Sequence, residues 1–286
     1  MILREILTRS EEFLVRKGID NAKGDTRRLL AHGLGIAPLQ ILLQLDRPML
    51  EAEIATLRQL VARRGQNEPL QHILGTWAFR YLELFVDGRA LIPRPETESL
   101  VDLVLERIRS VESPRVHEVG VGTGCIGLSI KREFPDARVT GSDISPEALS
   151  LCRKNAQSLG VWFPVFQGSL AAGIQESCLD VLVSNPPYIA TGELEGLSAE
   201  VQHDPMLALD GGPDGLSLIR PLVTQAASAL KPGGWLLLEH GWDQGKSTRA
   251  LCREGWEDVE TVQDLDGKDR FLVAHKAGPA MATLVD

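Results

Sequence analysis

The segment Asn185-Pro186-Pro187-Tyr188 brings together a carboxamide, two prolines and an aromatic ring. It follows the apolar run 179–184, which predicts a buried strand that passes into a loop at Asn185. The two prolines restrict φ and remove two backbone donors, and Asn185 is driven toward extended geometry by the proline after it. Such a stiff segment could hold a planar NH2 group by its hydrogens and leave the nitrogen open to attack an electrophile.

Asn185, Pro186 and Tyr188 are therefore the candidate catalytic residues, and all four residues are expected to contact the substrate. The side-chain oxygen of Asn185 and the backbone carbonyl of Pro186 would accept the two amide hydrogens and stabilise positive charge building on the nitrogen. Tyr188 would pack against the substrate, and Pro187 would keep the segment rigid. The alternative is a strand followed by a proline-rich turn, which these four residues alone do not exclude.

A second motif lies upstream and reads His117-Glu118-Val119-Gly120-Val121-Gly122-Thr123-Gly124. It stands between a predicted strand and a predicted helix, the context in which a glycine-rich turn binds a nucleotide-like ligand. Its glycines allow the backbone to approach that ligand closely. No lysine of the phosphate-binding type follows, so a loop that grips phosphate is not expected. The candidate ligand-binding residues of this motif are Glu118, Gly120, Val121, Gly122, Thr123 and Gly124.

A carboxylate follows the glycine-rich turn by about 20 residues, which is the usual place of a partner for ribose hydroxyls. This residue is Asp143, at the end of the predicted strand 137–142. Asp143 could instead cap or turn the chain into the helix that begins near Pro146, and it could do both.

The periodicity of apolar residues predicts the elements that carry these groups. Residues 1–75 have helical patterns and form a small helical domain, residues 76–94 form a β-hairpin linker, and residues 95–286 alternate strands with helices. The expected strands are 115–119, 137–142, 162–167, 179–184, 233–239, 256–262 and 270–275, and the expected helices are 95–110, 125–133, 146–159, 215–229 and 244–253. This alternation predicts an α/β fold whose mostly parallel sheet binds ligands at the carboxyl ends of its strands, where all three site segments fall.

The same order of glycine loop, acidic residue and Asn-Pro-Pro-Tyr is found in methyltransferases that modify planar amino nitrogens. The chain resembles the release factor glutamine methyltransferases over nearly its whole length. The segments that carry the resemblance, besides the two motifs, are 25–32, 63–64, 68–70, 73–75, 92–98, 204–216 and 266–270. The resemblance implies a Rossmann-like class I methyltransferase sheet with an N-terminal helical domain that recognises the substrate.

The resemblance also implies the reaction. S-adenosylmethionine would donate a methyl group to the glutamine amide of the Gly-Gly-Gln motif in class I peptide chain release factors, leaving S-adenosylhomocysteine, with no metal. Asn185 would also contact this cofactor. Two positions depart from the family's pattern: Glu118 stands where an aspartate is usual, and Ser169-Leu170 stand where an acidic residue and an aromatic are usual near the adenine. Ser169 and Leu170 could still offer a hydroxyl and an apolar contact.

The composition is that of a globular enzyme: 286 residues, 43% of them hydrophobic, and a net charge of −9. We expect a cytoplasmic protein, because no apolar run approaches a membrane span or a signal peptide core and four scattered cysteines show no metal-ligand spacing. The negative charge argues against a grip on nucleic acid. Three alternatives stay open: a nucleic-acid amino-methyltransferase, a glutamine methyltransferase of a ribosomal protein, and a non-catalytic cofactor-binding module.

Overall fold

The computed structural model describes residues 1–278, which divide into two compact units. The first unit contains residues 1–76 and also residues 197–203, and the second contains residues 77–196 and 204–278. The chain therefore passes from one unit to the other three times. Each unit has its own core and is described separately.

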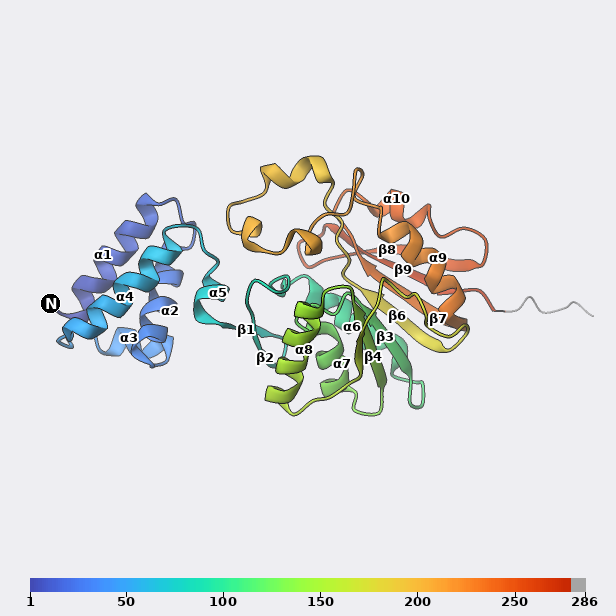
Figure 1. Cartoon of the computed structure of the whole chain (residues 1–286), viewed down its shortest axis with the longest axis horizontal. Coiled ribbons are helices and arrows are strands. Elements are labelled where there is room, and N and C mark those ends of the chain that lie inside the picture. The colour runs from blue at the N-terminus through green and yellow to red at the C-terminus, as the bar shows by residue number, and fades with distance from the viewer. Residues whose placement is uncertain (279–286) are drawn as a thin grey trace, which may run out of the picture. The chain divides into compact units, whose positions relative to one another are not determined.

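The first unit is helical. Its elements are α1 (Leu3–Arg16), α2 (Ala22–Leu34), α3 (Pro38–Leu43), α4 (Glu51–Arg64) and α5 (Leu70–Leu74), drawn in blue to cyan in Figure 1. Each long helix buries the apolar residues of one face, such as Leu29 and Leu30 of α2 and Leu57 of α4, all at most 1% exposed. The helix α2 ends at Gly35, whose φ of 65° is a conformation that glycine adopts without strain.

A buried ion pair holds this unit together. The Nε of Arg64, at the end of α4, donates to the Asp25 carboxylate of α2 over 2.7 Å, and both residues are at most 5% exposed. A second guanidinium nitrogen donates to the backbone carbonyl of Glu68 over 3.2 Å, and a third pairs with the carboxylate of Glu200. Glu200 lies in the segment 197–203, so Arg64 connects that segment to the helices.

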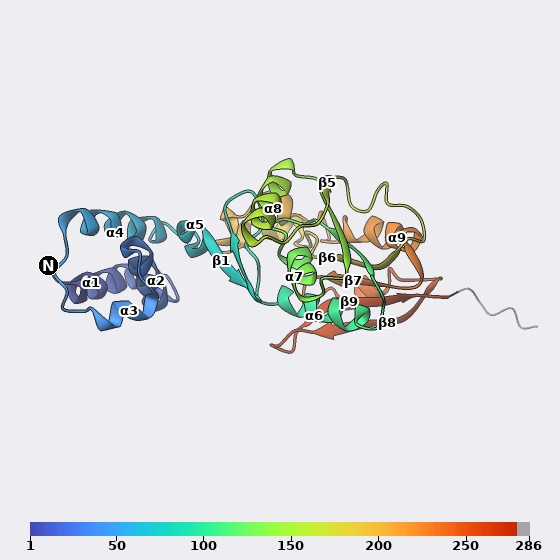
Figure 2. The ribbon, with the colours of Figure 1, turned by 90° about the horizontal axis from the view of Figure 1, so that it is seen from below.

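The second unit is built on a seven-stranded sheet with the order β5-β4-β3-β6-β7-β9-β8, which can be followed in Figures 1 and 2. The first five strands in this order are parallel, and β9 runs antiparallel to both of its neighbours. The strands are β3 (Arg115–Val119), β4 (Arg138–Asp143), β5 (Val165–Gln167), β6 (Leu179–Ser184), β7 (Leu230–Glu239), β8 (Trp256–Gln263) and β9 (Asp269–Lys276). A separate two-stranded sheet is formed by β1 (Thr76–Phe79) and β2 (Leu82–Phe85).

Helices cover both faces of the large sheet, because successive strand residues point to opposite sides. Val181 and Val183 of β6 join the core formed with α6 (Thr97–Ile108), α7 (Cys125–Glu133) and α8 (Pro146–Leu159). Leu182, between them, joins the core formed with α9 (Ile219–Ala229). A short helix, α10 (Gly245–Arg249), packs against β8 and β9.

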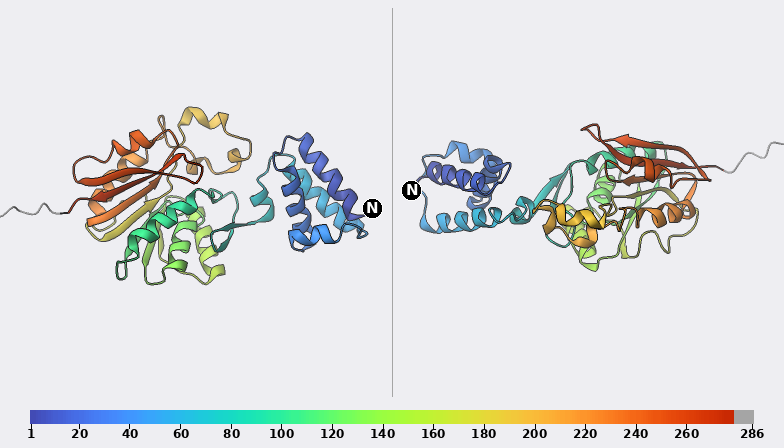
Figure 3. Two further views of the ribbon diagram at one scale, coloured as in Figure 1. Left: turned by 180° about the vertical axis from the view of Figure 1, so that it is seen from behind. Right: turned by 90° about the horizontal axis from the view of Figure 1, so that it is seen from above.

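The predicted α/β class with a parallel sheet is confirmed, and each predicted strand and helix of this region has a counterpart. Several bounds differ. The predicted strand 162–167 begins only at Val165, because Pro164 has no N–H for the ladder. The predicted helix 215–229 begins at Ile219, and the predicted helix 244–253 is limited to Gly245–Arg249. The long connection from β6 to α9, gold in Figure 3, contains three short 3-10 turns, Thr191–Gly196, Val201–His203 and Met206–Ala208.

Replacing Arg64 with methionine should destabilise the helical unit by about 3–5 kcal/mol, because the Asp25 carboxylate would stay buried without its cation. Urea unfolding followed by circular dichroism would measure the loss. The matched control is Arg63→Ala, which removes a 45% exposed partner of Glu68 and should cost about 1 kcal/mol or less. Equal losses for the two variants would contradict a special role for the buried pair.

Candidate active site

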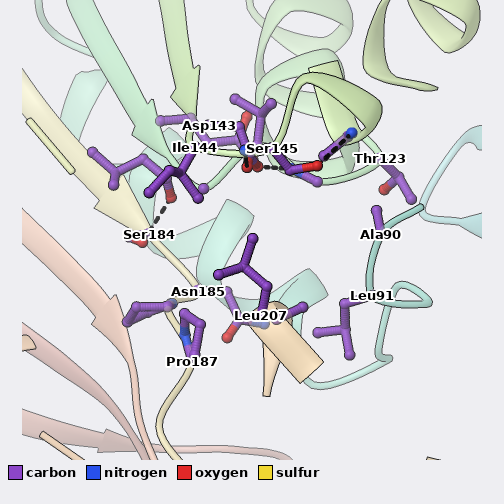
Figure 4. Close-up of a pocket in the computed structure, with 18 of the residues that line it drawn as sticks. Ala90, Leu91, Thr123, Asp143, Ile144, Ser145, Ser184, Asn185, Pro187 and Leu207 are labelled. Carbon is purple, nitrogen blue, oxygen red and sulfur yellow. Dashed lines mark hydrogen bonds between the residues drawn. The ribbon is translucent and has the colours of Figure 1, made fainter. Parts of the chain in front are cut away.

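A cavity of about 200 Å³ lies in the second unit, at the carboxyl ends of β3, β4 and β6. The strand order reverses between β3 and β6, since the chain runs outward through β4 and β5 before it returns to β6. This is the place where open α/β sheets bind ligands. Figure 4 shows the strand-end residues Asp143 and Ser184 on one side of the cavity and Ala90 and Leu91 on the other. The predicted residues that line it are Glu118, Gly120, Val121, Gly122, Thr123, Asp143, Ser169, Leu170, Asn185, Pro186 and Pro187.

The glycine-rich turn bends sharply after β3. Gly120 and Gly122 have φ values of 72° and 52°, which a residue with a side chain rarely adopts. The backbone N–H groups of Gly120 and Val121 both donate to the carbonyl of Ser142 at the end of β4, over 2.8 and 3.1 Å. A Cβ at Gly120 would meet no atom within 4 Å, so this glycine leaves free space beside the cavity.

Glu118 is the most deeply buried acid of the cavity. Its Oε2 accepts a hydrogen bond of 2.8 Å from the N–H of Gly127 in α7, and it is 1% exposed. Its Oε1 is buried without a partner. Burial, assisted by the nearby charge of Asp143, raises the pKa of Glu118 well above its usual range. The site therefore holds a buried carboxyl oxygen that no group of the described residues satisfies.

Asp143 joins two loops at the floor of the cavity. Its Oδ2 accepts from the N–H of Gly122 and its Oδ1 from the N–H of Ser145, each over 2.9 Å. The cap of α8 is Ser145, whose Oγ accepts from the N–H of Ala148, so the alternative of Asp143 as the helix cap is wrong. Asp143 does turn the chain toward this helix. Each of its oxygens retains a lone pair for a ligand hydroxyl.

The Asn-Pro-Pro-Tyr segment leaves the end of β6 and carries Asn185 into the cavity wall (Figure 4). The Nδ2 of Asn185 donates to the hydroxyl of Thr97 over 3.1 Å, and this hydroxyl donates to Glu239 over 2.7 Å. With one N–H engaged by Thr97, the carboxamide keeps its oxygen as an acceptor for a ligand. Glycine makes the tight packing behind the segment possible, because a Cβ at Gly215 would lie 2.3 Å from the carbonyl oxygen of Tyr188.

Two predicted site residues do not line the cavity. The ring of Tyr188 points into the protein, where its hydroxyl donates to Glu239 over 3.3 Å. Burial raises the pKa of Tyr188, so its hydroxyl keeps its proton. The sequence had led us to expect that the ring would pack against a ligand. In the observed placement, the ring face is not presented to the cavity. Gly124 instead begins α7 with a φ of 83°, and a Cβ there would lie 2.7 Å from the Sγ of Cys152.

Further walls come from two loops whose residues were not among the predicted site residues. Residues 89–94 and residues 205–208 contribute side chains, among them Leu207 with 56% exposure. The buried Asp204 joins the loops, because its Oδ2 accepts from Arg94 over 2.6 Å and its Oδ1 from the N–H of Ile92 over 3.2 Å. Thr97 and Glu239 were also missed. They are 142 positions apart, and no local pattern signals their pairing.

The described residues, 1–278, contain neither a candidate metal site nor a candidate membrane span. No group of three or more histidine, cysteine, aspartate or glutamate side chains there could hold a metal ion. No helix among them is long and apolar enough to cross a membrane.

The sequence of this chain is similar to those of known proteins. Residues 5–75 match the family model of the PrmC N-terminal domain, and residues 97–201 match the methyltransferase small domain. The release factor glutamine methyltransferase of Deinococcus radiodurans is 43% identical over 97% of this chain and 100% of its own length. The enzyme of the same name from Geobacter sulfurreducens is 40% identical over 94% of this chain and 95% of its own length.

The chain belongs to the release factor glutamine methyltransferases. It is therefore a methyltransferase, as the two motifs had predicted. A solved methyltransferase from Pyrococcus furiosus has the same fold, with a TM-score of 0.50 and 18% identity over 71% of this chain and 92% of that one.

The methyltransferase should lose stability as the pH rises through about 7, because of Glu239. Burial raises the pKa of this carboxyl from 4.5 to about 7. Its contribution is complete below the unfolded pKa of 4.5 and is lost as the pH rises through the folded pKa. Between pH 5 and pH 8 the wild type should lose about 2–3 kcal/mol more than the Glu239→Gln variant.

Urea unfolding of both proteins at the two pH values would measure this difference. The comparison with the variant cancels the contributions of Glu118 and of the histidines. Equal pH dependence in the two proteins would show that the pKa of Glu239 is not raised in the folded protein.

Proposed function

We propose that the enzyme transfers a methyl group from S-adenosylmethionine to the side-chain amide nitrogen of the glutamine in the Gly-Gly-Gln motif of class I peptide chain release factors. One observation carries this proposal. The Asn185 carboxamide, whose nitrogen is already bound by Thr97, lines the same cavity as the unsatisfied carboxyl of Glu118. A hydrogen-bond acceptor for an NH2 group thus adjoins a pocket with a buried, unsatisfied carboxyl, which suits a cationic cofactor.

Several residues that line the cavity suit the polar and apolar groups of the proposed cofactor. The free Oε1 of Glu118 would accept a hydrogen from the ammonium group of the methionine part, and Asp143 would accept from the ribose hydroxyls. A cation beside Glu118 would lower the pKa of its carboxyl again. Ile144 and Leu170 offer apolar contacts for the adenine, and Ser169 offers a hydroxyl. S-adenosylmethionine would supply a methyl group activated by its sulfonium sulfur and leave as S-adenosylhomocysteine.

The residues of this chain would act on the glutamine amide by orienting it. The Oδ1 of Asn185 and the carbonyl of Pro186 accept its two hydrogens, which turns the nitrogen toward the methyl group. A carboxamide nitrogen is a poor nucleophile, so this placement matters, and it can contribute on the order of 7–11 kcal/mol at best. The same oxygens stabilise positive charge as the new bond forms. The methylated amide is strongly acidic until it loses its extra proton, and water can accept that proton.

We assign the choice of substrate mainly to the helical unit and the connection from β6 to α9. The family model of the N-terminal domain covers residues 5–75, and the curated relatives carry release factors in their names. A net charge of −9 disfavours a nucleic-acid substrate, since the excess of negative charge repels the phosphate backbone. We propose that the enzyme acts in the cytoplasm, where release factors work.

Transfer of tritiated methyl from S-adenosylmethionine to purified release factor tests the reaction and its target. A release factor with Gly-Gly-Gln changed to Gly-Gly-Ala, ribosomal proteins and plasmid DNA run in parallel. Label on the intact release factor alone is the expected result. Label on a ribosomal protein or on DNA would replace the proposed substrate, and equal label on the Gly-Gly-Ala variant would place the methyl group elsewhere.

Replacing Asn185 with alanine should lower kcat by about 100-fold or more, because the amide loses its acceptor in the transition state. Affinity for S-adenosylmethionine, measured by calorimetry, should change little. Gln157→Ala, an exposed position of α8, serves as the matched control and should retain normal kcat. Near-normal turnover of Asn185→Ala with normal cofactor affinity would rule out this mechanism.

A further inference from the structure

Two hydrogen bonds connect Asn185 to a buried acid behind the cavity, Glu239, and a third reaches the same acid from Tyr188. The Nδ2 of Asn185 donates to the Oγ1 of Thr97 over 3.1 Å, and the Thr97 hydroxyl lies 2.7 Å from the Oε2 of Glu239. The hydroxyl of Tyr188 donates to the Oε1 of Glu239 over 3.3 Å. Thr97 and Glu239 are only 2% and 1% exposed, so solvent does not compete for these bonds.

The direction of these bonds depends on the proton of Glu239. A threonine hydroxyl has one hydrogen, and an ionised carboxylate can only accept. With Glu239 ionised, the hydrogen of Thr97 must go to Glu239, and Thr97 can then only accept from Asn185. The Asn185 carboxamide is thereby fixed with its nitrogen toward Thr97 and its oxygen away from it.

Protonation of Glu239 removes this constraint. The carboxylic acid can donate to Thr97, and the Thr97 hydroxyl can then donate in its turn to the oxygen of Asn185. The carboxamide can now rotate by half a turn about its terminal bond. In the rotated form it offers the cavity an NH2 donor, which would repel a second NH2 group.

We propose that Glu239 is a positioning residue that acts through Thr97 to keep the oxygen of Asn185 available to the substrate, and that protonation of Glu239 releases Asn185. The value of this orientation for catalysis depends on the proposed function, in which that oxygen accepts a hydrogen from the glutamine amide. The orientation itself depends only on the hydrogen bonds of the protein.

The surroundings of Glu239 place its titration near neutral pH. Burial has the largest effect and raises the pKa of Glu239 to about 7, while the positive charge of Arg270 lowers it and the charge of Glu96 raises it. Arg270 is itself bound to Asp264 over 3.2 Å. The other titratable groups near Glu239 are Tyr188, Cys125 and the adjacent His240; burial keeps the first two protonated and the histidine neutral.

Side-chain amide NMR tests the orientation without any substrate. The chain has four asparagines, Asn21, Asn67, Asn155 and Asn185, so labelling asparagine with nitrogen-15 gives four NH2 pairs. The pair missing in Asn185→Ser identifies Asn185. In the wild type this pair should shift with a midpoint near pH 7, and in Glu239→Gln it should not shift with pH. A wild-type pair that does not titrate, or that titrates equally in Glu239→Gln, would overturn the proposal.

Kinetics with the release factor test the consequence for catalysis. Thr97→Val should lower kcat by about tenfold or more with little change in the KM for S-adenosylmethionine, and Thr97→Ser should restore it, since serine keeps the hydroxyl. The acid limb of the wild-type kcat profile, with its midpoint near pH 7, should be absent in Glu239→Gln. Full activity of Thr97→Val would overturn the positioning role.

The two measurements separate this proposal from the function on which its catalytic part depends. If the wild type methylates no release factor, the proposed function is wrong, and NMR still decides whether Glu239 controls Asn185. If the wild type is active and Asn185 does not respond to Glu239, only the positioning role is wrong.

Discussion

The site depends on one topological constraint, the reversal of strand order between β3 and β6. The chain continues from β3 to β4 and from β6 to β7, so the connections after these two parallel neighbours run in opposite directions along the sheet. Neither connection covers the gap between the two strands, and a crevice stays open at their carboxyl ends. The glycine-rich turn leaves β3 on one side of this crevice, and Asn185 leaves β6 on the other. A pocket for a nucleotide-like ligand and the Asn185 side chain, which can bind a second molecule, are thereby placed side by side.

Three acids are buried around this crevice, and their environments satisfy them to different degrees. Asp143 receives two backbone N–H groups, and Glu239 receives two hydroxyls and the nearby charge of Arg270. Glu118 receives a single N–H and keeps one bare oxygen. Burying a carboxyl with so little compensation costs stability. The cost is concentrated at the position where a cationic ligand would relieve it, which favours binding over the empty state.

Much of this architecture could be predicted from the sequence, because period-two and helical patterns are local. The strands that end at Asp143 and Ser184 were located from such patterns, and the glycine spacing predicted the turn that follows β3. The direction of the Tyr188 ring could not be predicted, because it depends on Glu239, 51 positions later. The same holds for Thr97 and for the pairing of Arg94 with Asp204. Each of these contacts forms only when the sheet brings distant segments together, because a buried acid then accepts a hydrogen bond from a donor that lies near it.

Neither of the two compact units is a single continuous segment of the chain. Because residues 197–203 belong to the first unit and both flanks of that segment belong to the second, no single cut divides the chain into two complete units. A fragment ending at residue 76 would contain Arg64 without Glu200, and the complementary fragment would carry Glu200 without Arg64. A gene fusion that replaces only residues 1–76 would therefore lose the Arg64–Glu200 ion pair. An engineered exchange that keeps this ion pair must therefore include both residues 1–76 and residues 197–203, although they lie far apart in the sequence.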